Sequence, residues 1–188
     1  MREMIRELIA AIAPYDSLER EQVEDAAVWI DSGVEIFRIE KPDVPPKHLV
    51  SYFVLLDNDK LLLIDHKKAQ LWLPPGGHVE KNEHPTDTVK REIQEELSLN
   101  ADFIVEVPFF ITQNKTVNTD AGHTDVSLWY LLRGNSEEVI HYDIGEFNGY
   151  RWFSFEEIES MGSSIFHPDL GRFMGKLRDF EVGAGKFE

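Results

Sequence analysis

The sequence predicts an α/β layered domain that is preceded by a short helical extension. Apolar runs of strand length are interleaved with segments whose apolar residues recur at helical spacing. A Pro-Pro-Gly-Gly turn at 74–77 separates a predicted hairpin from the most strongly predicted helix. A chain of 188 residues is long enough for one well-buried domain plus an extension, which makes two full domains unexpected.

The extension comes first. Residues 2–13 and 18–31 each carry an apolar stripe at helical spacing. A proline-rich connector at 41–47 follows, so we take 1–44 as a helical N-terminal extension with its linker and 45–188 as the main domain. The two helices either pack against the outside of the domain, which we favour, or form a lid or a dimer contact.

The main domain begins with a predicted buried hairpin. Its strands are the apolar runs at 49–56 and 61–64, and the polar residues between them form a tight turn. Further strands are predicted at 103–112, 126–132, 139–142 and 150–153, and further helices at 155–161 and 170–180. Strands that alternate with helices in this way favour a layered α/β arrangement.

A helix over 85–97 carries the chemistry that the sequence indicates. Pro85 suits the first helical position, and apolar residues recur every four positions. At about 100° per residue, Glu92, Glu95 and Glu96 fall within roughly 100° of arc beside the apolar stripe. Carboxylates held this close repel one another unless a cation lies between them, and Mg²⁺ prefers oxygen ligands. The alternative is a solvated acidic face.

The stretch from Gly77 to Leu99 resembles the Nudix box, G-x5-E-x7-R-E-U-x-E-E-x-G-U, in which U is aliphatic. The matching positions are Gly77, Glu83, Arg91, Glu92, Ile93, Glu95, Glu96 and Leu99. Ser98 stands where the family has glycine, so we expect a displaced or altered helix end. The resemblance covers roughly 47–160 and implies a Nudix-type α/β/α sandwich with a mixed sheet.

The resemblance also implies roles for the box residues. Glu95 and Glu96 occupy the positions of the family's principal metal ligands, and Glu92 that of a ligand or a base. Gly77 would offer its backbone carbonyl to the metal, and Arg91 would orient the glutamates. The implied cofactor is Mg²⁺, with Mn²⁺ as an alternative. Such a metal neutralises charge on the phosphate oxygens while water attacks phosphorus.

Several loop residues are candidates for the rest of the site. Glu146 resembles a family loop glutamate that acts as base or metal ligand; its alternative is an exposed carboxylate. His66, Lys67 and Lys68 could contact substrate phosphates or form a solvated loop. His123 could touch phosphate or base, or could pair with the aspartate two positions on as a metal ligand. Loop-end hydrogen bonding is the reading we favour for it.

Composition narrows the classes of partner. A formal net charge of −16 disfavours a protein that grips nucleic acid, whereas a small anionic substrate stays compatible with a local metal. The absence of cysteine excludes disulfides and thiolate chemistry. The N-terminal segment reads as an amphipathic helix and no apolar run approaches the length of a membrane span. We therefore expect a cytoplasmic protein that acts on a small molecule.

The box indicates which bond is cleaved and leaves the rest of the substrate open. The family's marker residues for ADP-ribose, NADH and diadenosine polyphosphate are absent, which leaves an NTP or dNTP pyrophosphohydrolase as the leading reading. One alternative is a catalytically silent Nudix-fold module that binds nucleotides or regulates. A second is a hydrolase of a nucleotide-sugar or another nucleoside diphosphate derivative. A homodimer is also compatible with the sequence.

Overall fold

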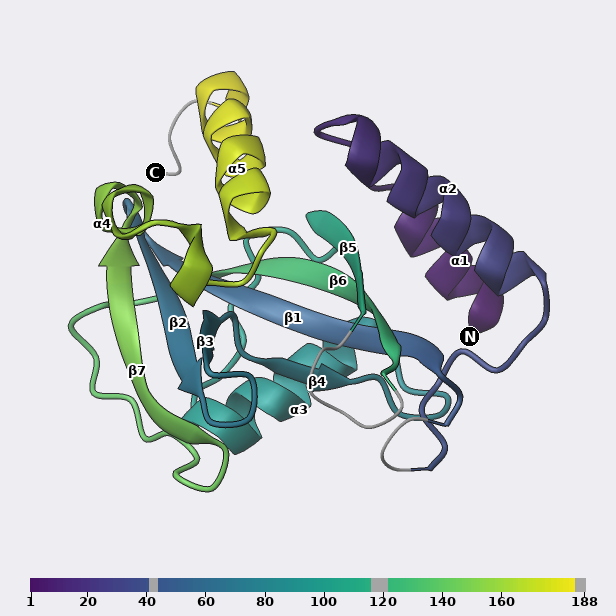
Figure 1. Ribbon diagram of the computed structural model, residues 1–188, viewed down its shortest axis with the longest axis horizontal. Coiled ribbons are helices and arrows are strands. Elements are labelled where there is room, and N and C mark those ends of the chain that lie inside the picture. Colours follow the sequence, from purple (N-terminus) through teal and green to yellow (C-terminus); the bar gives the residue numbers. More distant parts are fainter. Residues whose placement is uncertain (41–43, 116–121, 185–188) are drawn as a thin grey trace.

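The computed structural model describes residues 1–40, 44–115 and 122–184 (Figure 1). Its helices are α1 (Arg2–Ala10), α2 (Ser17–Asp31), α3 (Pro85–Leu97), α4 (Phe155–Met161), the short 3-10 helix η1 (Ser163–Ile165) and α5 (Leu170–Ala184). Its strands are β1 (Lys47–Asp57), β2 (Lys60–His66), β3 (Leu71–Leu73), β4 (Gly76–His78), β5 (Phe110–Lys115), β6 (Thr124–Arg133) and β7 (Phe147–Ser154). None of these helices combines the length and apolar character that a transmembrane span requires.

The strands form one mixed, seven-stranded sheet. Five strands follow the order β3-β2-β1-β6-β5, while β4 pairs with β1 and β7 pairs with β2. The central pair, β1 and β6, is parallel, and the other pairings are antiparallel. Figure 1 shows α3 on one side of the sheet and α5 on the other. The predicted α/β sandwich with a mixed sheet is therefore confirmed.

Alternate residues of β1 divide the core into two layers. Phe53 and Leu55 join the apolar cluster that includes α3, whereas Val54 and Leu56 join the cluster that includes α5. This division follows from the period of two along a strand. Because β1 is covered on both sides, its sequence reads as a continuous apolar run instead of an alternating one.

The N-terminal helices pack against the domain, as we favoured. Apolar residues of both helices, Ile5 among them, belong to the cluster that includes α3. The N-cap of α2, Asp16, accepts hydrogen bonds from Arg172 of α5 at 2.7 and 2.8 Å. Glu19 is fully buried and pairs with Lys176 of α5 at 2.7 Å. Both apolar packing and ion pairs therefore attach the extension.

Two predicted strands differ from the structure. Within 103–112, Phe103 makes only an isolated bridge to β6, and the regular strand β5 begins after Pro108. Proline lacks the N–H group that a sheet ladder needs, which explains the late start. The strand predicted at 139–142 is wrong, because those residues lie in a loop. The backbone N–H of Asp143, directly after this segment, donates to the carbonyl of Glu96 near the end of α3 and not to a strand.

The expected displacement of the end of α3 is also wrong. The helix ends at Leu97, and Ser98 itself takes the left-handed conformation, with φ 56° and ψ 30°. The N–H of Ser98 bonds to Gln94 O and that of Leu99 to Ile93 O, which closes the last turn. A short polar side chain tolerates this conformation at a cost, so the helix keeps the end that glycine would give it.

Ser98→Gly should therefore stabilise the protein. Glycine removes the left-handed strain but loses more conformational entropy on folding, so the net gain is expected to be about 0.5–1 kcal/mol. In a chain of this length that corresponds to a melting temperature about 1–4 °C higher. The matched control is Asn100→Gly, because Asn100 does not have a positive φ. The control should show only the entropic cost of glycine, and a Ser98→Gly variant destabilised as much as the control would contradict the strain argument.

Candidate active site

The box helix is placed against a short strand that carries the start of the box. In the pairing of β4 with β1, Gly77 lies opposite Ser51, whose hydroxyl donates to the backbone carbonyl of the first residue of α3 at 3.1 Å. At the other end of α3, Glu96 Oε2 accepts from the backbone N–H of Gly76 at 3.0 Å. These contacts hold Gly76 and Gly77 of β4 beside the glutamates.

Arg91 donates hydrogen bonds to several groups of the box. Its Nε and Nη2 each donate to one carboxylate oxygen of Glu83 at 3.0 Å, and Nη1 donates to Glu92 Oε1 at 2.5 Å. Nη2 also reaches the backbone carbonyl of His78 at 3.2 Å, and Nη1 lies 3.6 Å from Glu95 Oε2. One planar guanidinium thereby connects the loop before α3, the helix and β4.

The glutamates of α3 lie in different environments. Burial, the charge of Glu92 and the charge of Glu146 together raise the pKa of Glu96 to about 9. Burial likewise raises the pKa of Glu92, although Arg91 opposes the shift. Glu95 differs, because its side chain is 61% exposed. A buried carboxyl, Glu96, and a partly buried one, Glu92, thus strongly disfavour sharing the site as two bare anions.

The backbone at Gly77 approaches Glu92 closely. A Cβ atom built on Gly77 would lie 1.9 Å from Glu92 Oε1 and 2.3 Å from Glu92 Cδ. Any side chain at this position would push the Glu92 carboxylate away from Arg91. Glycine at the start of the box therefore leaves room for the Glu92 carboxylate, and no unusual backbone angle is involved.

Gly77→Ala is expected to lower hydrolytic activity by about tenfold while the fold is retained, because displacing a group in an active site by about 1 Å is costly. The matched control is Gly149→Ala on β7, since a Cβ there would meet nothing within 4 Å. Initial rates and melting temperatures of both variants provide the test. Wild-type rates in Gly77→Ala would show that Glu92 can move without consequence.

These residues fit a hard divalent cation. The donors are carboxylate and backbone oxygens, which Mg²⁺ prefers over nitrogen. The carboxyls of Glu92 and Glu96 repel one another, and a cation between them would remove the cause of that repulsion. The close approach of Gly77 leaves its backbone beside the same carboxylate. The donor set thus agrees with the cofactor that the box implies.

The predicted loop residues Glu146, Lys67 and Lys68 lie in two loops that contact each other near the box. Glu146 is exposed, and its charge contributes to the raised pKa values of Glu92 and Glu96, so it lies near them. The backbone N–H of Lys67 donates to Glu146 O at 3.1 Å, which joins the two loops. Lys67 also donates through Nζ to a carbonyl of the 143–146 loop, while Lys68 is exposed.

His66 is more buried than its two neighbours. Its Nδ1 accepts backbone N–H bonds at 3.2 and 3.1 Å, which caps the turn that follows β2. Burial lowers the pKa of His66, and the charge of Glu146 acts in the opposite direction. The structure thus brings His66, Lys67 and Glu146 together at one border of the box.

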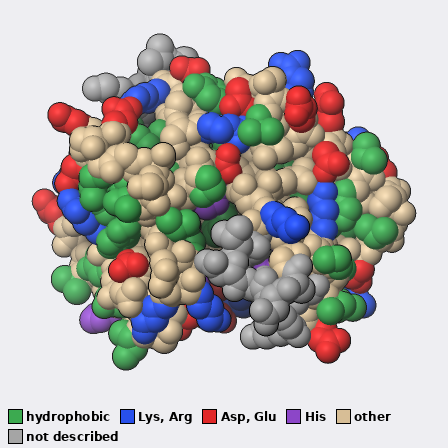
Figure 2. All heavy atoms as spheres, in the orientation of Figure 1, with side chains coloured by type: hydrophobic (Ala, Val, Ile, Leu, Met, Phe, Trp, Pro, Cys, Tyr) green, Lys and Arg blue, Asp and Glu red, His purple; other side chains and the backbone are tan. Residues whose placement is uncertain are grey.

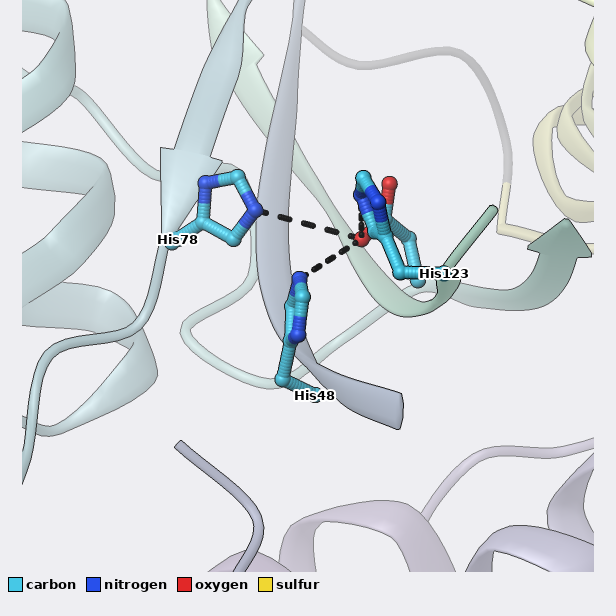
Figure 3. A group of neighbouring side chains, drawn as sticks. His48, His78 and His123 are labelled. Atoms are coloured by element: carbon cyan, nitrogen blue, oxygen red, sulfur yellow. Dashed lines mark ion pairs between the residues drawn. The ribbon is translucent and has the colours of Figure 1, made fainter. Parts of the chain in front are cut away.

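His123 lies elsewhere, in a cluster with His48, His78 and Asp125 (Figure 3). Sequence reasoning considered His123 with Asp125 and missed the two other histidines, because three separate strands bring them together. A usable signal was present, because each histidine stands within three positions of a predicted apolar strand or turn. Figure 2 shows histidine side chains in a hollow near the centre of the visible face.

Comparison with known proteins identifies the family. Residues 46–173 match the model of the NUDIX domain, which extends the expected coverage through α4 and into α5. A probable DHNTP pyrophosphohydrolase from Lactococcus lactis subsp. cremoris (strain MG1363) is 30% identical over 103 residues, which are 50% of this chain and only 59% of that protein. An asymmetrical bis(5'-nucleosyl)-tetraphosphatase from Rattus norvegicus is 31% identical over 130 residues, which are 66% of this chain and 78% of that protein.

Solved structures agree on the fold. A NUDIX family hydrolase from Clostridium perfringens superposes with a TM-score of 0.56 at 22% identity, covering 71% of this chain and 97% of that one. The dihydroneopterin triphosphate pyrophosphohydrolase of E. coli gives a TM-score of 0.53 at 14% identity, covering 80% and 100%. The family model, the box residues around Arg91 and the mixed sheet all lead to one conclusion. The chain belongs to the Nudix family of hydrolases.

Proposed function

We propose that the protein hydrolyses a diphosphate linkage in a nucleoside di- or triphosphate or a related derivative, with the help of a divalent metal. The observation that carries this proposal is the group of carboxyls Glu92, Glu96 and Glu146, whose charges act on one another beside the Gly76–Gly77 turn. A solvated acidic face would not bury Glu96 and partly bury Glu92. The arrangement has the chemistry of a cation site placed at a reaction centre.

Glu92, Glu95, Glu96 and the Gly77 carbonyl would hold the metal, Mg²⁺ or alternatively Mn²⁺. Bound there, it would supply charge neutralisation on phosphate oxygens and make water more acidic. Arg91 keeps Glu92 in place and is itself held by Glu83, so its role is positioning. The acids therefore need little rearrangement when the substrate binds.

Glu146 is our candidate for the general base or for a further metal ligand. Its side chain is exposed and its charge acts on both Glu92 and Glu96, so it could reach water beside them. The neighbouring loop carries His66, Lys67 and Lys68. Lys68 is exposed, and its charge would attract substrate phosphates into a protein that is otherwise strongly acidic.

The names of relatives support the class of bond. The Lactococcus relative is called a pyrophosphohydrolase, and the rat relative a tetraphosphatase. A third relative, from Rickettsia prowazekii (strain Madrid E), is called an RNA pyrophosphohydrolase and is 28% identical over 134 residues, which are 63% of this chain and 81% of that protein. The three names differ in the substrate and share phosphate-anhydride cleavage. They therefore support this class of bond for our protein more than they support any one of the three substrates.

The test is a substrate panel assayed with Mg²⁺, with Mn²⁺ and with EDTA. The panel holds NTPs, dNTPs, nucleotide-sugars and dinucleoside polyphosphates, and release of phosphate, pyrophosphate or nucleotide is measured. We expect hydrolysis of at least one nucleoside phosphate, abolished by EDTA. Turnover that is independent of metal would contradict the mechanism. A nucleotide that raises the melting temperature but is never cleaved would favour the silent binding module instead.

A further inference from the structure

Three histidines and one aspartate from three strands meet on one face of the sheet. His48 belongs to β1, His78 to β4 and Asp125 to β6, while His123 lies one residue before β6. One ligand atom from each residue can be chosen so that all four atoms lie within 4.8 Å of one another. Figure 3 shows the three imidazoles directed toward the same carboxylate oxygen.

This cluster is separate from the box glutamates. His48 lies opposite Asp125 in the parallel β1–β6 pairing, and His78 lies opposite Val50 in the β1–β4 pairing. Residues 48 and 50 share a face, because side chains alternate along a strand. Ser51, the next residue along β1, points to the opposite face and contacts α3 through its hydroxyl. The cluster therefore occupies the side of the sheet away from α3.

Hydrogen bonding in the cluster directs ring nitrogens inward. His48 Nδ1 lies 2.8 Å from Pro45 O, and since a carbonyl only accepts, Nδ1 carries the hydrogen. In the neutral ring Nε2 then presents its lone pair to Asp125 Oδ1, 3.2 Å away. Among the described residues, no partner meets hydrogen-bond geometry at this buried Nε2.

His78 presents a lone pair as well. Its Nε2 lies 3.2 Å from Arg38 Nη1, and a guanidinium only donates, so Nε2 is the acceptor. His123 completes the group, with Nε2 3.3 Å from Asp125 Oδ1 and its ring stacked on His48 at 4.8 Å. Ring nitrogens and a carboxylate that gather around one space are the donor set of a metal site.

We infer that His48, His78, His123 and Asp125 form a second metal site, selective for a divalent transition metal of the zinc class. Imidazole ligands suit Zn²⁺ and its first-row neighbours, whereas Mg²⁺ prefers an all-oxygen site such as the box. The bond from His48 Nδ1 to a backbone carbonyl is the outer contact that fixes the tautomer of metal-binding histidines. The two sites thus differ in the cation they take.

Two of the three distances from Asp125 match four-coordinate binding, and the third is longer. For bonds of about 2.0–2.1 Å, ligand atoms at the corners of a tetrahedron lie about 3.3 Å apart. The distances from Asp125 Oδ1 to Nε2 of His48 and His123 are 3.2 and 3.3 Å. The corresponding distance for His78 is 3.9 Å. His78 must therefore move inward by about 0.6 Å and exchange its contact with Arg38 for the metal.

A metal there would join β1, β4 and β6. The backbone carbonyl of His78 accepts from Arg91, and Gly77 precedes it directly. Binding would consequently restrain the strand that carries the first residue of the box. We assign this site a structural role in holding β4, with no part in bond cleavage.

The experiment measures bound zinc in excess Mg²⁺. Purified full-length protein is stripped with chelator, incubated with Zn²⁺ and Mg²⁺, desalted and analysed by inductively coupled plasma mass spectrometry. We expect about one zinc per chain and a raised melting temperature. His123→Gln and the nearly isosteric Asp125→Asn should each lower bound zinc at least tenfold, judging from the smaller losses caused by outer-shell changes. Asp125→Asn keeps the test valid if the histidine variant does not fold.

Three comparisons decide between this site and its alternatives. His141→Gln changes an exposed histidine and should keep the zinc, as should Glu96→Gln in the box. Arg38→Gln removes the competing contact to His78 and should tighten zinc binding. No zinc on the wild-type protein would overturn the proposal. Zinc that is lost in Glu96→Gln but kept in Asp125→Asn would also overturn it, because the metal would then occupy the box.

Discussion

Glu96→Gln is expected to lower kcat for metal-dependent hydrolysis by at least about a hundredfold. Glu96 lies on α3 at the position of a principal metal ligand, its oxygen is held by the N–H of Gly76, and Glu92 and Glu146 act on it. Changes to outer contacts of metal ligands typically cost about 10–100-fold, so loss of a ligand charge should cost at least the upper value. The amide keeps the size of the side chain and the acceptor for Gly76.

The same variant should be more stable than the wild type in the absence of metal. Burial raises the pKa of Glu96 from 4.5 to about 9 in the folded state. Between these values the unfolded state binds fewer protons, so the free energy of unfolding falls as pH rises. Glutamine has no such penalty. In chelator, the melting temperature of Glu96→Gln should exceed that of the wild type, and the difference should grow between about pH 5 and about pH 8.

Added Mg²⁺ should reverse this order, because the cation stabilises only the protein that binds it. Glu106→Gln is the control, since this glutamate is exposed in the loop before β5. It should change neither kcat nor the pH dependence of the melting temperature. Full activity in Glu96→Gln would remove Glu96 from the site. If the melting temperatures of the variant and the wild type depended equally on pH in chelator, burial of the Glu96 carboxyl would have no cost in stability.

The box could be predicted because its information is local. Pro85 sets the first turn of α3, and the spacing of Glu92 and Glu96 alone places both carboxyls on one side of a helix. The hairpin of β1 and β2 was predictable for the same reason, since two apolar runs flank a tight turn. The end of α3 was misjudged, because a displaced or altered end was expected, whereas the helix ends at Leu97 and Ser98 itself takes the left-handed conformation.

Features that depend on distant pairings could not be predicted. The cluster around Asp125 requires the register of β1 with both β4 and β6, and β1 joins β6 in parallel across a long stretch of sequence. The links from α2 to α5 through Asp16 and Glu19 also join residues more than 150 positions apart. No local pattern specifies which of the 35 acidic residues forms an ion pair with which lysine or arginine.

Arg91→Lys is expected to weaken the apparent affinity for Mg²⁺ by about 10–100-fold, the usual cost of losing an outer contact of a metal ligand. Lysine keeps the charge but has a single ammonium group. It cannot donate two parallel bonds to Glu83 and also reach Glu92 and the His78 carbonyl. The measurement is initial rate against free Mg²⁺ concentration. Lys90→Arg, at the exposed neighbouring position, should leave the curve unchanged.

A double variant distinguishes a shared role from two independent ones. Glu83 accepts from both Arg91 and Thr88, and the latter contact is 2.7 Å long, so Glu83→Gln should weaken the hold on Arg91 without removing the helix contact. If Glu83 acts only by holding the guanidinium, Arg91→Lys combined with Glu83→Gln should cost little more than Arg91→Lys alone. Effects that multiply would mean that Glu83 contributes separately. Wild-type Mg²⁺ dependence in Arg91→Lys would mean that Glu92 keeps its position through burial, and that the planar fork is dispensable.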